Sequence, residues 1–536
     1  MKKFTTVIVA LILIISLSFS SLAAVGTILN ERELFVAPKA ERVMFDFLDG
    51  TVNGLVKGIA ALMPIPESWK DKYTPEGFMQ GTGEFITAPS ETAVWSLGYD
   101  SRSLLPENKD DVIGKYYVAG TISTSNKYAT SVEDDLLVRT VTISDGPDRS
   151  TAVFCTIDSY GMSLADVREI RVRLAGWAKD NNVKSITVSV LHQHSAIDTF
   201  GMNGNIWQMA LLNPLYTAFG GKTTNGKNPD YMENLFSKCC ESIKAAEEKM
   251  TEGKLYFGTA DASKYLNDKR QPYINDPNFN RLRFVPADNS KETWIVTTAI
   301  HCVGNGAAGT VVTGDYPYYA EQVINKYGAN IMFVLGAEEC NNQNRDKDSV
   351  TNYDENASRI ETTKGFGDSI GKAITAISND KEIAPLLNIR YKEIYLPVDN
   401  GVLLFAAKAG VFENIVRKID GKWNVISEIG YMEMGEDMAF AIIPGELAPE
   451  LAYGGCLSAE YSWSGKDWEY PSLQDITGER DLYVLGLAND QIGYIVPDND
   501  YMSMLHEDSK SIEFVSLGKN TASKIIEEFG KLVNNE

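Results

Sequence analysis

The clearest regular pattern in the chain is a strand, a helix and a strand in succession. Residues 150–158 (STAVFCTID) and 183–191 (VKSITVSVL) are apolar runs with the length of buried strands. Between them, residues 163–181 carry apolar side chains at helical spacing, and Ser163 followed three residues later by Asp166 is typical of a helix start. The pattern predicts a β-α-β unit, which places two parallel strands in one sheet.

Another run indicates that the sheets are mixed. Residues 136–144 (LLVRTVTIS) alternate apolar and polar side chains, as in an antiparallel strand. From residue 83 onward the sequence has no repeat and no long low-complexity linker. We therefore predict an α/β fold in which mixed β-sheets are layered with helices, and one large domain over residues 83–536.

The first 82 residues differ from the rest. Residues 1–24 have two lysines, an apolar stretch and then small residues, which predicts a signal peptide and export of the mature chain. Residues 25–82 form an N-terminal helical segment, with Val52, Leu55, Val56, Ile59 and Leu62 at helical spacing. We favour a helix packed on the main domain over an interfacial membrane anchor, because the segment has little positive charge for lipid headgroups. Peripheral membrane contact stays open.

Charge and cysteine content exclude some classes of function. The formal net charge of -22, with no basic cluster interleaved with aromatic residues, argues against a nucleic-acid partner. Six cysteines scattered over 536 residues do not form the framework of a disulfide-rich fold. The oligomeric state cannot be deduced from the sequence.

Polar residues able to do chemistry follow five of the apolar runs. In open α/β sheets, ligands collect beyond the carboxyl ends of the strands, so these positions are candidates for a functional site. They are His192 and His194, His301, Glu338 and Glu339, Glu446, and Tyr494. We expect the adjacent carboxylates Glu338 and Glu339 to have a structural or supporting role, because buried carboxylates need partners.

Three of these residues have the side chains that a hydrolytic zinc ion prefers. Such an ion keeps about three protein ligands of the His, Asp or Glu type and an open position for water. His192, His301 and Glu446 would supply that set, although three unrelated residues remain the alternative. His192 and His194 can point the same way only if the backbone bends after the strand.

Motifs of other enzyme classes are absent. The sequence has no HExxH, no P-loop and no GxSxG. Residues 304–309 (GNGAAG) satisfy GxGxxG, but the β-branched, turn-rich stretch that follows them is not the helix of a dinucleotide-binding fold.

At these positions the sequence resembles the neutral/alkaline non-lysosomal ceramidases and their bacterial relatives, which are zinc amidohydrolases that cleave the amide of N-acylsphingosine. HQHSAIDTFG (192–201) is similar to the family's HTHSxPxT/G stretch, and it departs at Gln193 and Ile197. Residues 294–324 resemble the second zinc segment, in which a histidine ends a strand. IIPGEL (442–447) resembles the PGE motif, and residues 487–501 (LANDQIGYIVPDNDY) resemble the segment that supplies a tyrosine ligand.

The resemblance implies a role for each matching residue. The metal ligands would be His192, His301, Glu446 and Tyr494, with His194 facing the substrate. DKRQPYINDP (268–277) is similar to an NRSP…NP stretch whose arginine contacts the reacting amide, so Arg270 takes that place. An ungapped alignment after Tyr494 brings His506 to the place of a second tyrosine near the substrate, which would put all four histidines in one site.

Two departures concern the mechanism and the domain content. In the CNNQNRD stretch (340–346), Asn344 stands where many ceramidases have a serine nucleophile, which favours attack by metal-activated water. The chain ends at residue 536, so we expect the N-terminal catalytic domain without the C-terminal immunoglobulin-like domain of longer ceramidases.

The resemblance thus predicts a secreted, Zn²⁺-dependent amidohydrolase that acts on N-acylsphingosine or a related N-acyl lipid. A metal hydrolase for another amide or ester, and a non-catalytic lipid-binding relative, are the alternatives.

Overall fold

The structure of the protein is a computed structural model. It describes residues 39–65, 81–122, 126–147, 149, 151–221, 223–306, 308–455 and 458–536. The expected signal peptide, residues 1–24, lies outside these residues. Among the residues described, no helix has both the length and the apolar character that crossing a bilayer requires.

The larger sheet contains nine of the described strands, in the order β11-β9-β8-β6-β1-β3-β4-β5, with β13 paired to β6. Their bounds are β1 Trp95–Ser103, β3 Leu137–Ser144, β4 Thr151–Ile157, β5 Val183–Val190, β6 Thr251–Asp261, β8 Asn278–Pro286, β9 Glu292–Thr298, β11 Ala329–Leu335 and β13 Lys381–Ile383. β4 and β5 are parallel, as are β9 and β11, whereas β3 is antiparallel to both of its neighbours. The sheet is therefore mixed, as the sequence predicts.

The predicted β-α-β unit is formed by β4, helix α3 (Leu164–Asp180) and β5. Ser163 caps α3, and it exchanges hydrogen bonds with Asp166 in a capping box. Such a cap satisfies amide groups that the first turn of a helix leaves unpaired. The local pattern of the sequence thus fixes where the helix begins.

The smaller sheet packs face to face on the larger one. It has the order β14-β16-β17-β19, with β15 beside β16, and the bounds are β14 Leu387–Pro397, β15 Val416–Ile419, β16 Lys422–Met434, β17 Met438–Ile442 and β19 Asp481–Leu485. Side chains from both sheets form one apolar cluster, which includes Trp95, Leu255, Ile295, Met432 and Phe440. Burial of these side chains, at about 25 cal/mol per Å² of apolar surface, holds the sheets together.

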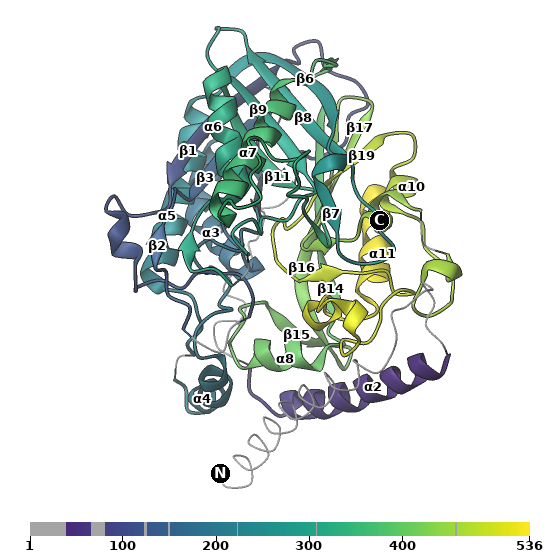
Figure 1. The fold of residues 1–536 in the computed structure, drawn as a ribbon. Coiled ribbons are helices and arrows are strands. Elements are labelled where there is room, and N and C mark those ends of the chain that lie inside the picture. Colours follow the sequence, from purple (N-terminus) through teal and green to yellow (C-terminus); the bar gives the residue numbers. More distant parts are fainter. Residues whose placement is uncertain are drawn as a thin grey trace.

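Helices cover the two outer faces (Figure 1). On the larger sheet lie α3, α5 (Pro229–Glu248), α6 (Asp315–Tyr327) and α7 (Arg359–Thr375). On the smaller sheet lie α8 (Gly401–Lys408), α9 (Pro449–Tyr453), α10 (Leu473–Thr477) and α11 (Thr521–Val533). The fold is a sandwich of helices, sheet, sheet and helices, which confirms the predicted α/β class.

Shorter elements connect these layers. They are α4 (Ile206–Ala218) and the paired short strands β2 (Ser131–Val132) with β10 (Val311–Val312), β7 (Leu266–Asp268) with β12 (Asn341–Gln343), and β18 (Glu446–Leu447) with β20 (Tyr494–Ile495). The N-terminal helix α2 spans Lys39–Ala61 and packs along α8, where the Gly401 amide donates to Asn53 Oδ1 over 2.9 Å.

Candidate metal centre

The candidate site lies where the carboxyl ends of β5 and β9 meet. His192 follows β5 and His301 follows β9. A backbone hydrogen bond joins the two loops, because the amide of His194 donates to the Cys302 carbonyl over 3.1 Å. A second bond ties the loop after β9 to β12, because the amide of His301 donates to the Asn341 carbonyl over 2.8 Å. The strands are buried and rigid, so their ends hold the imidazoles in fixed positions.

Glu446 and Tyr494 reach the same place on another pair of strands. They are direct partners in the parallel β18–β20 pair. The Tyr494 ring also stacks beside the His301 ring, with the ring centroids 6.4 Å apart. The structure therefore brings together all four predicted metal ligands, His192, His301, Glu446 and Tyr494, at strand ends.

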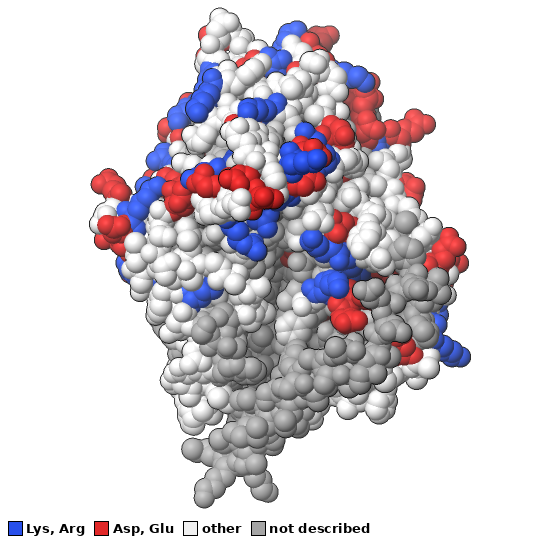
Figure 2. All heavy atoms as spheres, in the orientation of Figure 1, with Lys and Arg blue, Asp and Glu red and all other residues white. Residues whose placement is uncertain are grey.

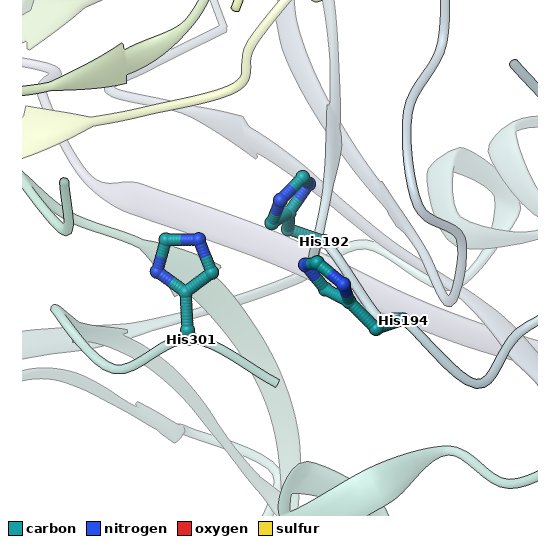
Figure 3. Close-up of side chains that lie close together, drawn as sticks. All are labelled: His192, His194 and His301. Carbon is teal, nitrogen blue, oxygen red and sulfur yellow. The ribbon is translucent and has the colours of Figure 1, made fainter. Parts of the chain in front are cut away.

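The backbone bends at His192, as the shared direction of the two neighbouring histidines requires. His192 has a φ of 51°, in the left-handed region that side chains rarely adopt. The centroid of its ring lies 4.7 Å from that of His194 and 5.0 Å from that of His301. The three imidazoles thus form one cluster (Figure 3). Strain of this kind persists where the surrounding structure enforces it, often at functional sites.

Backbone and carboxylate groups orient two of the imidazoles. His192 Nδ1 lies 2.8 Å from the Tyr160 carbonyl oxygen. His301 Nδ1 lies 3.1 Å from the Glu338 carbonyl oxygen and also contacts the Glu338 carboxylate. An imidazole that donates through Nδ1 has a free lone pair on Nε2 when it is neutral. This second layer of contacts is what metal-binding histidines ordinarily have.

Both Nε2 atoms are directed at one carboxylate oxygen. Glu446 Oε2 lies 3.0 Å from His301 Nε2 and 3.4 Å from His192 Nε2, and the latter nitrogen is buried without a hydrogen bond. Gln491 donates to the other oxygen, Oε1, over 3.2 Å. Nitrogen lone pairs that face a carboxylate in a buried site are repelled by it unless a proton or a metal cation lies between them. This geometry fits a metal ion.

The electrostatics of the site agree with this conclusion. Burial alone would lower the pKa of His301, but the negative charge of Glu338 and the contact with Glu446 raise that pKa to about 10. Burial alone would raise the pKa of Glu446, but His192 and His301 hold it below its usual range. The site thus attracts positive charge, from a proton or from a metal ion.

His194 differs from the other two histidines. Both of its ring nitrogens are buried and make no hydrogen bond. Burial, followed by the neighbouring His192 and His301, lowers its pKa well below the usual value. His194 is therefore a neutral imidazole beside the candidate metal ligands, with a nitrogen available to a substrate.

Arg270 is buried and surrounded by carboxylates. Its guanidinium donates to Asp500 Oδ2 over 2.7 Å and to Glu513 Oε1 over 2.9 Å. Glu339 lies 3.9 Å from its Nε. Both terminal nitrogens are used in these ion pairs, which leaves them no direct role with a substrate in this arrangement.

Asn344 does not contact the histidines. It lies in the turn after β12, and its side-chain amide donates to the Lys264 carbonyl over 2.8 Å and to Asp346 over 3.0 Å. The side chain therefore stabilises a turn.

His506 is held by the N-terminal helix. Its Nε2 lies 2.9 Å from Glu41 of α2, and its ring packs on Phe45 and Trp463, each with ring centroids 5.0 Å away. No contact within the described part of the chain joins it to the other histidines. The expectation of all four histidines in one site is not met, because Glu41 and the two aromatic rings hold the imidazole elsewhere.

Two residues of the site were not singled out in the sequence. Tyr160 holds His192 through its carbonyl and packs its ring on His192 and His194, at centroid distances of 4.3 and 5.0 Å. Tyr160 follows the carboxyl end of β4, the parallel neighbour of β5. The rule that functional residues follow strand ends could therefore have identified it from the sequence. Gln491, which holds Glu446, follows β19 and had no such signal beyond its closeness to Tyr494 in the sequence.

An apolar pocket opens beside the metal site. Glu446, Tyr160 and Gln491 form part of its wall. The rest is mainly apolar, and it includes Phe200, Met202, Leu403, Leu404, Ala407 and Phe412. A mostly apolar pocket with a few polar groups at one place is the usual form of a small-molecule site.

Comparisons with known proteins found similarity in structure but none in sequence families. No protein-family model matches the sequence, and no curated protein matches it. The structure is similar to that of neutral ceramidase from Pseudomonas aeruginosa, with a TM-score of 0.62 and 13% identity, over 82% of this chain and 74% of that one. It is also similar to a ceramidase complexed with C2, with a TM-score of 0.60 and 13% identity, over 82% of this chain and 75% of that one. The chain has the fold of the neutral ceramidases.

Proposed function

We propose that the protein is a zinc-dependent amidohydrolase that cleaves the amide bond of N-acylsphingosine or a related N-acyl lipid. The observation that carries the proposal is the convergence of His192 Nε2 and His301 Nε2 on one oxygen of Glu446, beside an apolar pocket. The shared fold supports the same chemistry. The composition of residues 1–24 supports a further part of the proposal, which is that the enzyme is exported.

The metal would be held by His192, His301, Glu446 and Tyr494. A zinc ion held by these four ligands would act as a Lewis acid, which activates water and polarises a carbonyl group. The other residues keep these ligands in place: the Tyr160 carbonyl and Glu338 fix the two imidazoles, and Gln491 fixes the carboxylate. Loss of such supporting contacts typically costs 10- to 100-fold in metal affinity or activity.

His194 would transfer the proton that amide cleavage needs. Its nitrogens have no competing partner, and its ring lies 4.7 Å from the His192 ring, so it is placed to accept a proton from the attacking water. The same group can then donate that proton to the leaving amine. The proposed mechanism assigns no step to Arg270, Asn344 or His506, whose side chains are bound to other groups in this structure.

The apolar pocket would make the enzyme prefer substrates that carry an acyl chain. Its apolar wall would bind methylene groups, each contributing about 0.8 kcal/mol when buried. Glu446 lies at this wall, so an acyl chain in the pocket would place its carbonyl near the metal ligands. A lipid amide therefore suits the site better than a short polar amide.

Filling the pocket should change acyl preference and leave the chemistry intact. We expect Ala407→Leu, which adds bulk to the α8 wall, to lower kcat/KM for long-chain N-acylsphingosines by about tenfold, since overpacking costs about 1–3 kcal/mol. Hydrolysis of an N-acetyl substrate by the same variant is the internal control and should stay near the wild-type rate. An equal loss for both chain lengths would contradict the assignment of the pocket to the acyl chain.

The direct test is an assay of hydrolysis on purified protein. N-acylsphingosines of graded acyl length are compared with matched esters and with N-acyl amino sugars, before and after metal removal by a chelator. Amide cleavage that increases with chain length and returns when zinc is restored supports the proposal. Cleavage of esters or sugars alone would indicate another metal hydrolase, and bound lipid without turnover or metal would indicate a binding protein.

A further inference from the structure

The N-terminal helix α2 directs several polar side chains to the protein and leaves a row of uncharged residues exposed from Phe47 onward, although Asp46 is exposed and Phe45 and Val56 are buried. Its bonded polar residues reach inward: Glu41 to His506, Asp49 to the Met504 amide, Asn53 to the Gly401 amide, and Lys57 to Asp399. The exposed positions from Phe47 to Ile65 are uncharged and are occupied by Phe47, Gly50, Thr51, Gly54, Leu55, Gly58, Ala61, Leu62, Pro64 and Ile65. Phe47 is 72% exposed and Leu62 is 80% exposed. A surface helix ordinarily has the opposite arrangement.

Helix α4 extends this apolar surface. Its sequence, IWQMALLNPLYTA, has no charged residue, and Phe219 directly after it is 82% exposed. Met63, which follows α2, and Met209 of α4 belong to one apolar cluster, so the two helices flank the same part of the molecule. Figure 1 places both at one end of the molecule, and in Figure 2 the described surface at the lower left, where α4 lies, shows no blue or red side chain.

The same end contains the wall of the pocket. Phe200, Met202 and Phe412 line the pocket and belong to the cluster that Met63 and Met209 join. Helix α8, on which α2 packs, lines the pocket as well. The buried side chains Met63 and Met209, which lie behind the outer surface, thus share one apolar cluster with the wall of the pocket.

We propose that the outward face of α2, together with the α4 end, docks on the surface of an electrically neutral lipid bilayer. Single exposed apolar residues are common, but a contiguous apolar surface marks a site of interaction. The face offers no charge to anionic lipids, and the chain's net charge of -22 opposes both an anionic membrane and a second copy of the chain. A zwitterionic lipid surface avoids both penalties and covers the apolar side chains. The proposal does not depend on the proposed function.

The test uses the full mature chain and phosphatidylcholine vesicles that contain no N-acyl lipid, with binding measured by flotation. We expect the wild type to bind, and higher ionic strength to leave the binding unchanged, because no charges take part. We expect the double variant Phe47→Asp/Leu62→Asp to bind the vesicles at least about tenfold more weakly than the wild type. The single variant Phe219→Asp should show a loss of the same size. The matched control is Val172→Asp, which adds the same charge at an exposed apolar position of α3 and should bind like the wild type.

Three outcomes would overturn the proposal. The first is that the wild type does not bind the vesicles, and the second is that the double variant binds them as well as the wild type does. The third is a wild-type dimer, seen by light scattering, that the double variant converts to a monomer without any vesicle binding, because the face would then serve self-association. Circular dichroism of each variant shows that the fold is retained, and metal content and amide hydrolysis in solution report separately on the proposed function.

Discussion

Replacing His301 with alanine is expected to remove the bound metal ion and the hydrolytic activity together. His301 contributes an Nε2 that lies 3.0 Å from Glu446 Oε2, and Glu338 fixes its ring from the other side. Without it, the zinc would lose an imidazole, and the Glu446 carboxylate would lose one of its partners. Elemental mass spectrometry should show about one zinc per wild-type chain and almost none in the variant, with activity lower by about 10³-fold or more, because a Lewis acid contributes several kcal/mol.

The matched control for this experiment is His506→Ala, which removes the histidine that lies outside the cluster. Because His506 binds Glu41 and packs on Phe45 and Trp463, its loss should leave the zinc content unchanged. A zinc ion lost from His506→Ala but kept by His301→Ala would reverse the assignment of the two residues. Equal retention in both variants would show that the ion is held elsewhere.

The core of the site could be predicted because short patterns in the sequence determine it. β4, α3 and β5 were indicated by apolar runs and by the Ser163 cap, and a parallel sheet places the ends of such strands at one edge. His192 and His301 follow β5 and β9, which run in opposite directions near opposite edges of that sheet, so strand ends alone did not bring them together; the resemblance to the ceramidases did. The parallel pairing of Glu446 with Tyr494 then brings two further residues to the same place.

The roles of Arg270 and His506 could not be predicted in this way. Each lies in a plausible motif, but its partners are hundreds of positions away: Asp500 is 230 residues from Arg270, and Glu41 is 465 residues from His506. A local pattern carries no information about such contacts. The sequence left two alternatives for α2, a packed helix and an interfacial anchor, for a related reason: the side of a helix that is buried depends on α8 and on the residues around His506.

Arg270→Met is expected to lower the free energy of unfolding by about 3–5 kcal/mol, the largest loss of stability that we predict. Arg270 is 3% exposed, and its guanidinium neutralises buried carboxylates, with ion pairs of 2.7 Å to Asp500 and 2.9 Å to Glu513. Methionine fills a similar volume but leaves those charges without a partner, and Glu339 then adds to their repulsion. Urea unfolding followed by circular dichroism measures the loss, and Arg270→Lys, which keeps one positive charge, should lose less.

Arg173→Met separates this effect from the general cost of removing an arginine. Arg173 also binds two carboxylates, Glu169 at 2.8 Å and Glu233 at 2.7 Å, but it lies at the surface, where solvent screens the ion pairs. We expect a loss of about 0–1 kcal/mol for that variant. Arg270→Met could instead keep wild-type stability and lose only amide hydrolysis. That result would mean that the arginine contacts the substrate, as the resemblance to ceramidases implies. Its assignment to the buried carboxylate cluster would then be wrong. A loss of stability that Arg270→Lys partly restores would assign it to the cluster.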